Sequence, residues 1–160
     1  MKTTFWFVLA AFTMLGCSHT ARLYPVQGPL SAQTPSPVLV GKITGAFNSG
    51  DLSVKLSDGE LCKGRWSVVH PPQVAKGENA AVAPASNGMP AAWDAVYGQG
   101  FYVSHVLGTR LHAQAQLAGD KGTVLNVEMY RSTEEHAANI PASIKGVALD
   151  NKENIYKVAF

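Results

Sequence analysis

The chain has 160 residues, the usual size of one domain, and 46% of them are hydrophobic, as in an ordinary globular core. Its 13 basic residues nearly balance its 11 acidic ones. The charges are sparse and mixed in sign along the chain, without the basic stripe and interleaved aromatic residues typical of nucleic-acid-binding proteins. We therefore expect a single domain and no nucleic-acid partner.

The first sixteen residues have the pattern of an export signal. Lys2 provides a short positive start, and an apolar run follows from Phe5 to Leu15. The run has the length of the hydrophobic part of a signal peptide and is too short to span a bilayer comfortably. The sequence thus predicts a cleaved leader over residues 1–16 rather than a transmembrane helix.

The leader ends in Met14-Leu15-Gly16-Cys17, which resembles the lipobox of bacterial lipoproteins, with Met14 at a place where leucine is commoner. The resemblance implies that the leader is cut after Gly16 and that Cys17 carries lipid on its thiol and on its new amine. Several acyl chains anchor a protein firmly. In the enteric sorting rule an Asp after the cysteine retains a lipoprotein on the inner membrane, so Ser18 implies the outer membrane, on its periplasmic face. The alternative is a leader with a coincidental cysteine.

Residues 17–37 are predicted to be the lipidated N-terminus and an extended tether, because prolines and glycine punctuate polar residues there without a sustained period. Residues 38–160 are then a single β-rich domain. If Cys17 is lipidated, Cys62 has no partner for a disulfide within the chain. Cys62 shares strand parity with Trp66 and Val68, which predicts a buried thiol.

Period-two alternation predicts about eight short strands in this domain. They are expected at residues 38–47, 52–56, 60–69, 101–107, 110–117, 123–130, 145–149 and 155–160. Turn residues separate several of them, as at Asp58-Gly59 and Gly119-Asp120-Lys121-Gly122. Short helical turns are expected over Pro90 to Tyr97 and at Ser132 to Glu135. The fold class is therefore mainly β, an antiparallel sandwich or small closed barrel with one or two helical turns.

The sequence offers no catalytic, cofactor-binding or metal-binding residues that we would nominate. The five histidines lack short metal-ligand spacing, and the closest approach to a pair is His105 with His112. No nucleophile elbow, phosphate-binding loop or paired catalytic signature is present. Aromatic residues could line a pocket or simply fill the core. These are Trp66, Trp93, Tyr97, Phe101 and Tyr102.

The last strand ends the chain on Tyr156, Val158 and Phe160 at alternate positions. This ending resembles the recognition signal of outer-membrane β-barrel proteins. A transmembrane barrel turns an apolar face outward to lipid, whereas the expected strands combine one apolar face with charged residues on the other. A small outer-membrane barrel therefore stays open as an alternative, because alternation does not reveal which face is inside.

The body of the chain is similar to a group of small uncharacterised bacterial envelope lipoproteins. The similarity lies in Gly45 to Gly50, in Gly59 to Trp66 and in Val147 to Asn151. It implies a shared architecture and no particular activity. We expect a membrane-anchored, periplasm-facing lipoprotein with a binding or structural role, held by lipid on Cys17. An envelope protein or a small molecule is the open choice of partner, and a ligand-binding or hydrolytic enzyme is a further alternative.

Overall fold

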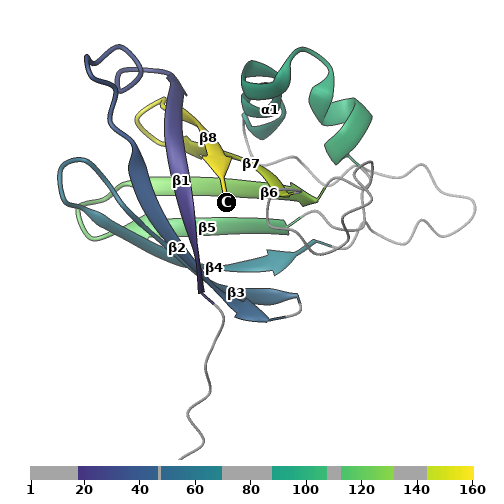
Figure 1. Ribbon diagram of the computed structural model, residues 1–160, viewed down its shortest axis with the longest axis horizontal. Helices are drawn as coiled ribbons and strands as arrows, with labels where there is room; N and C mark the ends of the chain where they lie inside the picture. The colour runs from purple at the N-terminus through teal and green to yellow at the C-terminus, as the bar shows by residue number, and fades with distance from the viewer. Residues whose placement is uncertain (1–17, 47, 70–87, 108–112, 132–143) are drawn as a thin grey trace, which may run out of the picture.

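Eight antiparallel strands follow one another around a closed barrel, and the last strand pairs with the first (Figure 1). The computed structural model describes residues 18–46, 48–69, 88–107, 113–131 and 144–160. The strands are β1 (Ser18–Gln27), β2 (Leu39–Ala46), β3 (Ser49–Lys55), β4 (Leu61–Val68), β5 (Ala113–Gly119), β6 (Val124–Arg131), β7 (Ile144–Asp150) and β8 (Ile155–Ala159). A helix, α1 (Met89–Tyr97), and a π-helical turn, η1 (Tyr102–Val106), precede β5. The mainly β prediction is confirmed, and the barrel is chosen over the sandwich.

The inner face of the barrel carries the apolar residues of the alternating pattern. Leu52 and Val54 of β3, Cys62 of β4 and Leu117 of β5 are all buried in one core cluster. Most of their sequence neighbours on the outer face are polar or charged, and most are exposed, with Leu61 and Ala118 as the apolar exceptions. Because side chains of a strand alternate between two faces, a strict period of two fixes which set lies inside.

The predicted tether is wrong for its first half. Ser18 to Gln27 forms β1, which pairs with β2 on one side and with β8 on the other. The prolines that suggested a tether are compatible with this strand, because Pro25 lies beside a bulge where the register with β8 shifts. The barrel therefore begins at Ser18 and not near Val38.

The strand predicted over residues 101–107 is also wrong, since this segment is helical. Tyr102 and Val106 are buried while Val103 and Leu107 are exposed. Residues four apart share a face in a strand and, nearly, in a helix, so the spacing of Tyr102 and Val106 does not separate the two structures. The count of eight strands survives because β1 replaces this one.

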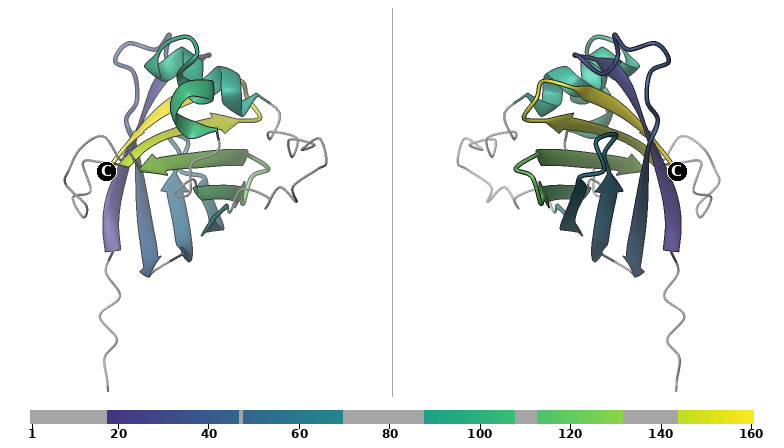
Figure 2. Two further views of the ribbon diagram at one scale, coloured as in Figure 1. Left: turned by 90° about the vertical axis from the view of Figure 1, so that its right-hand side faces the viewer. Right: turned by 90° about the vertical axis from the view of Figure 1, so that its left-hand side faces the viewer.

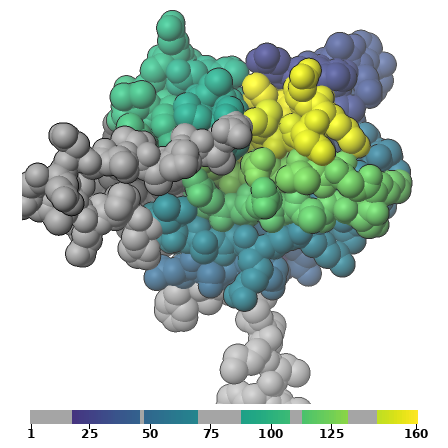
Figure 3. Space-filling model, turned by 180° about the vertical axis from the view of Figure 1, so that it is seen from behind, coloured from purple at the N-terminus to yellow at the C-terminus, as the bar shows by residue number. Residues whose placement is uncertain are grey.

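Helix α1 confirms the predicted helix and packs on the outside of the barrel, over β7 and β8 (Figures 1 and 3). Pro90 lies in its first turn, where a missing amide hydrogen costs nothing. Beneath α1 lies a second core cluster, outside the barrel. Its buried members are Met89, Ala92, Trp93, Tyr102, Val106, Tyr130, Val147 and Ile155. Trp93 is fully buried in it, and Val96 and Tyr97 are partly buried against it. This cluster covers one side of the barrel.

Several predictions fall outside the described residues: the leader, Cys17, the helical turn at 132–135, and the histidines at 70, 112 and 136. Within the described segments, no helix combines the length and apolar content needed to cross a bilayer.

Gly64 of β4 marks a close approach between β4 and β5. A Cβ atom there would collide with the backbone oxygen of Gln116 and lie 2.9 Å from Leu117 Cδ2. We expect Gly64→Ala to lower the free energy of unfolding by about 1–3 kcal/mol, the usual cost of overpacking. Urea unfolding at neutral pH measures this change.

The matched control is Ser67→Ala, which removes an exposed side chain from the same strand and should change stability by about 0.5 kcal/mol or less. Equal stability of the two variants would contradict the close approach.

Candidate functional site

The residue that follows the predicted lipidation position is the first residue of the barrel. Cys17 itself is outside the described residues, but Ser18 is the first residue of β1 and pairs with Thr44 of β2. Consecutive Cα atoms are only about 3.8 Å apart. Lipid on Cys17 would therefore attach to the barrel without any spacer.

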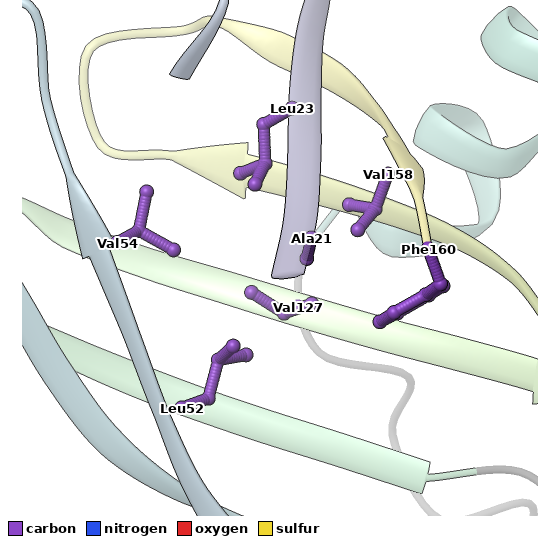
Figure 4. Close-up of a pocket in the computed structure, with 7 residues that line it drawn as sticks. All are labelled: Ala21, Leu23, Leu52, Val54, Val127, Val158 and Phe160. Atoms are coloured by element: carbon purple, nitrogen blue, oxygen red, sulfur yellow. The ribbon is translucent and has the colours of Figure 1, made fainter. Parts of the chain in front are cut away.

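The barrel interior is packed and leaves no room for a ligand. A cavity of about 10 Å³ lies between the strands, close to the volume of a single water molecule. Figure 4 shows its side chains pointing toward one another, and all of them are apolar: Ala21, Leu23, Leu52, Val54, Val127, Val158 and Phe160. An eight-stranded barrel is just narrow enough for side chains to fill it. The inner faces of the described strands therefore form a filled core around this cavity.

The C-terminal aromatic pattern belongs to this interior. Tyr156 and Val158 of β8 are buried in the barrel core, and Phe160 packs against it. The outward positions of β8 include the exposed Lys157. This is the reverse of a transmembrane strand, whose apolar residues face outward.

Cys62 is fully buried on the inner face of β4, as predicted. Burial, assisted by the negative charge of Glu60, raises the pKa of its thiol to about 11. The thiolate is the reactive form of cysteine. Cys62 therefore behaves as a small apolar core residue.

Glu60 is a buried carboxylate that ties two turns together. It precedes β4 and accepts hydrogen bonds from the Thr123 hydroxyl (2.5 Å) and from the Thr123 and Lys121 amides (both 2.9 Å). Lys152 Nζ lies 3.7 Å from Glu60 Oε2. The Thr123 hydroxyl bond is the largest cause that lowers the pKa of Glu60 to about 2, against the opposing effect of burial. Its acceptor sites are occupied by backbone and side-chain donors of the β5–β6 turn.

Asp150 plays the same part in the β7–β8 turn. Its carboxylate accepts the amide of Asn154 (2.8 Å), the side-chain amide of Asn154 (2.9 Å) and the hydroxyl of Tyr156 (2.7 Å). Asn154 in turn accepts the amide of Leu30 at 2.8 Å. These buried polar groups satisfy each other and close this end of the barrel.

Four rings spaced four residues apart form a stack along α1 and η1. Trp93, Tyr97, Phe101 and His105 follow one another with centroid separations of 5.4, 4.8 and 4.5 Å. Trp93 Nε1 also donates a 2.7 Å hydrogen bond to Glu128, an outward residue of β6 that lies buried beneath α1. The rings cover each other's faces, so the stack fixes the helix to the barrel wall.

The aromatic residues that the sequence grouped do not form one pocket. Trp66 lies apart from the stack and donates a 3.0 Å hydrogen bond to the Thr44 carbonyl oxygen, while Tyr102 is buried in the second cluster. The pair of His105 and His112 lies outside the described residues, because residue 112 does. Among the residues that the structure describes, no three metal-ligating side chains gather.

One surface feature was missed by sequence reasoning. The outward positions of β8 and β1–β4 form one continuous wall, and all its charged residues are exposed. The cations are Arg22, Lys42, Lys55, Lys63, Arg65 and Lys157, and the single acid is Asp51. We call this surface the basic wall. The alternation in the predicted strands already places these cations on outward faces. Only the barrel shows that the strands carrying them are neighbours.

The low pKa of Glu60 predicts how stability depends on pH. A carboxyl whose pKa falls on folding stabilises the native state above its unfolded value, near 4.5, and this contribution is lost as pH falls toward 2. Glu60→Gln should therefore be less stable than wild type at pH 7, and the difference should shrink between about pH 4.5 and 2.

Thermal unfolding of both proteins across this range measures the effect. Thr123→Val, which removes the strongest bond to the carboxylate, should show a weaker form of the same change. A difference that is constant with pH would show that Glu60 contributes by packing and not by its charge.

Burial predicts that Cys62 resists thiol reagents in the folded protein. With Cys17 lipidated or replaced by alanine, reaction at pH 8 should proceed only at the rate of unfolding, because the thiol is buried and protonated. Mass spectrometry follows the adduct. A cysteine at Val103, which is 68% exposed, serves as the control that reacts at once. Comparable rates at both positions would refute the buried assignment.

Comparison with known proteins found no matching family model, no matching curated protein and no matching solved structure. The function therefore has to be argued from the geometry of this chain.

Proposed function

We propose that the protein is a lipid-anchored envelope module, a bacterial lipoprotein cleaved before Cys17 that faces the periplasm from the outer membrane. The observation that carries this proposal is the start of β1 at Ser18, which is bonded into the barrel on both sides. A lipid on Cys17 would hold a preformed barrel directly on the bilayer. In this proposal the lipobox-like residues direct lipid to Cys17, and Ser18 directs the protein to the outer membrane.

The packed interior supports a binding or structural role exerted through the outer surface. The cavity between the described strands, about 10 Å³, is too small for a small-molecule ligand. The buried carboxylates Glu60 and Asp150 are occupied with turn amides and hydroxyls, which leaves them poorly placed for acid–base chemistry. An outside surface is then the part of the described molecule best suited to meet a partner.

The distribution of charge favours the anchored module over a barrel inserted in the membrane. The inner face is apolar, and exposed cations such as Arg22, Lys42 and Lys55 lie on the outer face. A charged side chain facing lipid near the bilayer midplane costs about 2–4 kcal/mol for Arg or Lys. A lipid-attached domain avoids this cost.

The test compares wild type with Cys17→Ala, both expressed from the full precursor in a bacterium that processes lipoproteins. We expect wild type to gain the mass of two or three acyl chains with their glycerol and to fractionate with the outer membrane, because the lipid alone anchors it. The alanine variant should keep its leader or be cut elsewhere, and it should carry no lipid.

The matched control is Cys62→Ala, which removes the buried thiol and should leave the lipid mass unchanged. A wild-type protein without lipid would refute the anchor. A lipid-free Cys17→Ala protein, cleaved and still integral to the outer membrane after carbonate washing, would make the membrane barrel the better account.

A further inference from the structure

The basic wall has a strong excess of positive charge, although the charges of the whole chain nearly balance. Six of its seven charged residues are cations, although the whole chain has 13 basic and 11 acidic residues. The one acid, Asp51, lies opposite Arg65 in the register of β3 and β4, with Arg65 Nε 4.0 Å from its carboxylate. The remaining cations have no acidic side chain on the wall to offset them. The wall should therefore attract an anionic partner.

The exposed apolar residues of the wall gather at its end away from Ser18, where β1 ends and β2 begins. Val40 of β2 lies between Arg22 of β1 and Lys55 of β3, and Tyr24 lies opposite Lys157 of β8. Five of the seven large exposed hydrophobic residues in the described part of the chain belong to the wall or its border. They are Tyr24, Val26, Val38, Val40 and Leu61. Tyrosine and valine flanked by long basic side chains are typical of surfaces that meet the headgroup region of a bilayer, where the charged ends reach the phosphates.

The proposed anchor emerges from an edge of this same wall. Ser18 pairs with Thr44, and Thr44 pairs with Asp51, so the first residue of β1 lies in a row with the wall's own strands. Figure 2 shows β1, β2 and β3 side by side, with α1 at the end of the molecule away from the start of β1. A lipid attached one residue before Ser18 would hold the Ser18 end of the wall next to the membrane surface, and docking would bring the rest of the wall, as far as Tyr24 and Val40, against it.

We propose that the basic wall docks against the anionic phospholipid headgroups of the bilayer that holds the lipid on Cys17. This inference rests on the proposed lipid anchor for the position of the wall and on its own charges for the contact. Docking sets the orientation of the barrel, with β1–β3 toward the bilayer and α1 away from it. The aromatic stack borders the wall at β8, where Lys157 Nζ lies 5.7 Å from the centre of the Tyr97 ring, and the flank over β7 is then left to face the periplasm.

The first experiment measures the orientation of the lipidated protein. Purified full-length mature lipoprotein is added to preformed vesicles, either phosphatidylcholine alone or phosphatidylcholine with phosphatidylglycerol. A water-soluble acylating reagent then labels lysines, and mass spectrometry gives the rate at each one. We expect Lys42 and Lys55 to react several-fold more slowly on the anionic vesicles, while Lys121 and Lys152, in the β5–β6 and β7–β8 turns outside the wall, react equally on both.

Raising the salt from about 0.1 M to about 1 M should remove the protection, because the Debye length falls from about 10 Å to 3 Å. Equal labelling of the wall lysines on both vesicles overturns the proposal. Equal protection on both also overturns it, since the anchor and not the charge would then bring the wall to the bilayer.

A second experiment separates the wall from the anchor. The mature chain with Cys17→Ala, which lacks lipid, is sedimented with the same two kinds of vesicle. We expect binding to the anionic vesicles only, and Lys42→Gln with Lys55→Gln should weaken it by roughly 5-fold for each lysine removed. The matched control, Lys121→Gln with Lys152→Gln, removes the same charge elsewhere and should bind as the parent does.

Failure of the two proposals is distinguishable. A wild-type mass without lipid refutes the anchor, whereas vesicle binding of the Cys17→Ala chain still tests the wall. Binding that is equal on neutral and anionic vesicles, or equal in the two double variants, overturns the wall proposal. Binding to heparin without binding to anionic vesicles overturns it too, and assigns the wall to a soluble polyanion.

Discussion

Pairing between β1 and β8 closes the barrel, with Leu23 opposite Val158 and Arg22 opposite Ala159. A closed barrel has no open edge, so every strand is bonded on both sides and no exposed backbone invites pairing with another chain. Closure also requires the strands to curve inward around a narrow core. The bulge near Pro25 serves this geometry by letting β1 change register against its partner.

Closure of the barrel makes β1 one of its strands, so it also determines where a lipid on Cys17 would be attached. Since β1 begins at Ser18, the barrel starts one residue after the predicted lipidation position and leaves no room for the predicted tether between them. The wall that contains β1 is then the part of the described molecule that lies closest to the proposed anchor. The exposed cations and valines of this wall matter because they lie on the same surface as β1. Neither their number nor their spacing in the sequence would suggest this arrangement.

The other parts of the barrel have different structural roles. Its interior is filled, with alanines at Ala21, Ala113, Ala115 and Ala148 among the larger residues. The turns at one end are joined by Glu60 and Asp150, whose buried charges are satisfied by hydrogen bonds to amides and hydroxyls. The side over β7 and β8 is covered by α1 through the stack that starts at Trp93. The outer faces of β1–β4, which make up most of the basic wall, carry exposed charged residues, whereas β8 lies partly under α1.

The sequence by itself determined the mainly β class, the inner face of most strands, α1 and the burial of Cys62, because these follow from local periodicity and turn residues. The leader and the lipid on Cys17 stay predictions from its motif. Only the tertiary structure decided that Ser18 to Gln27 is a strand and that residues 102–106 are helical. In the first segment, pairing with two partner strands outweighs the proline, and no local pattern reveals those partners. In the second, a spacing of four residues fits both a strand and a helix. The basic wall likewise depends on which strands become neighbours, a choice made by pairing between residues distant in the chain.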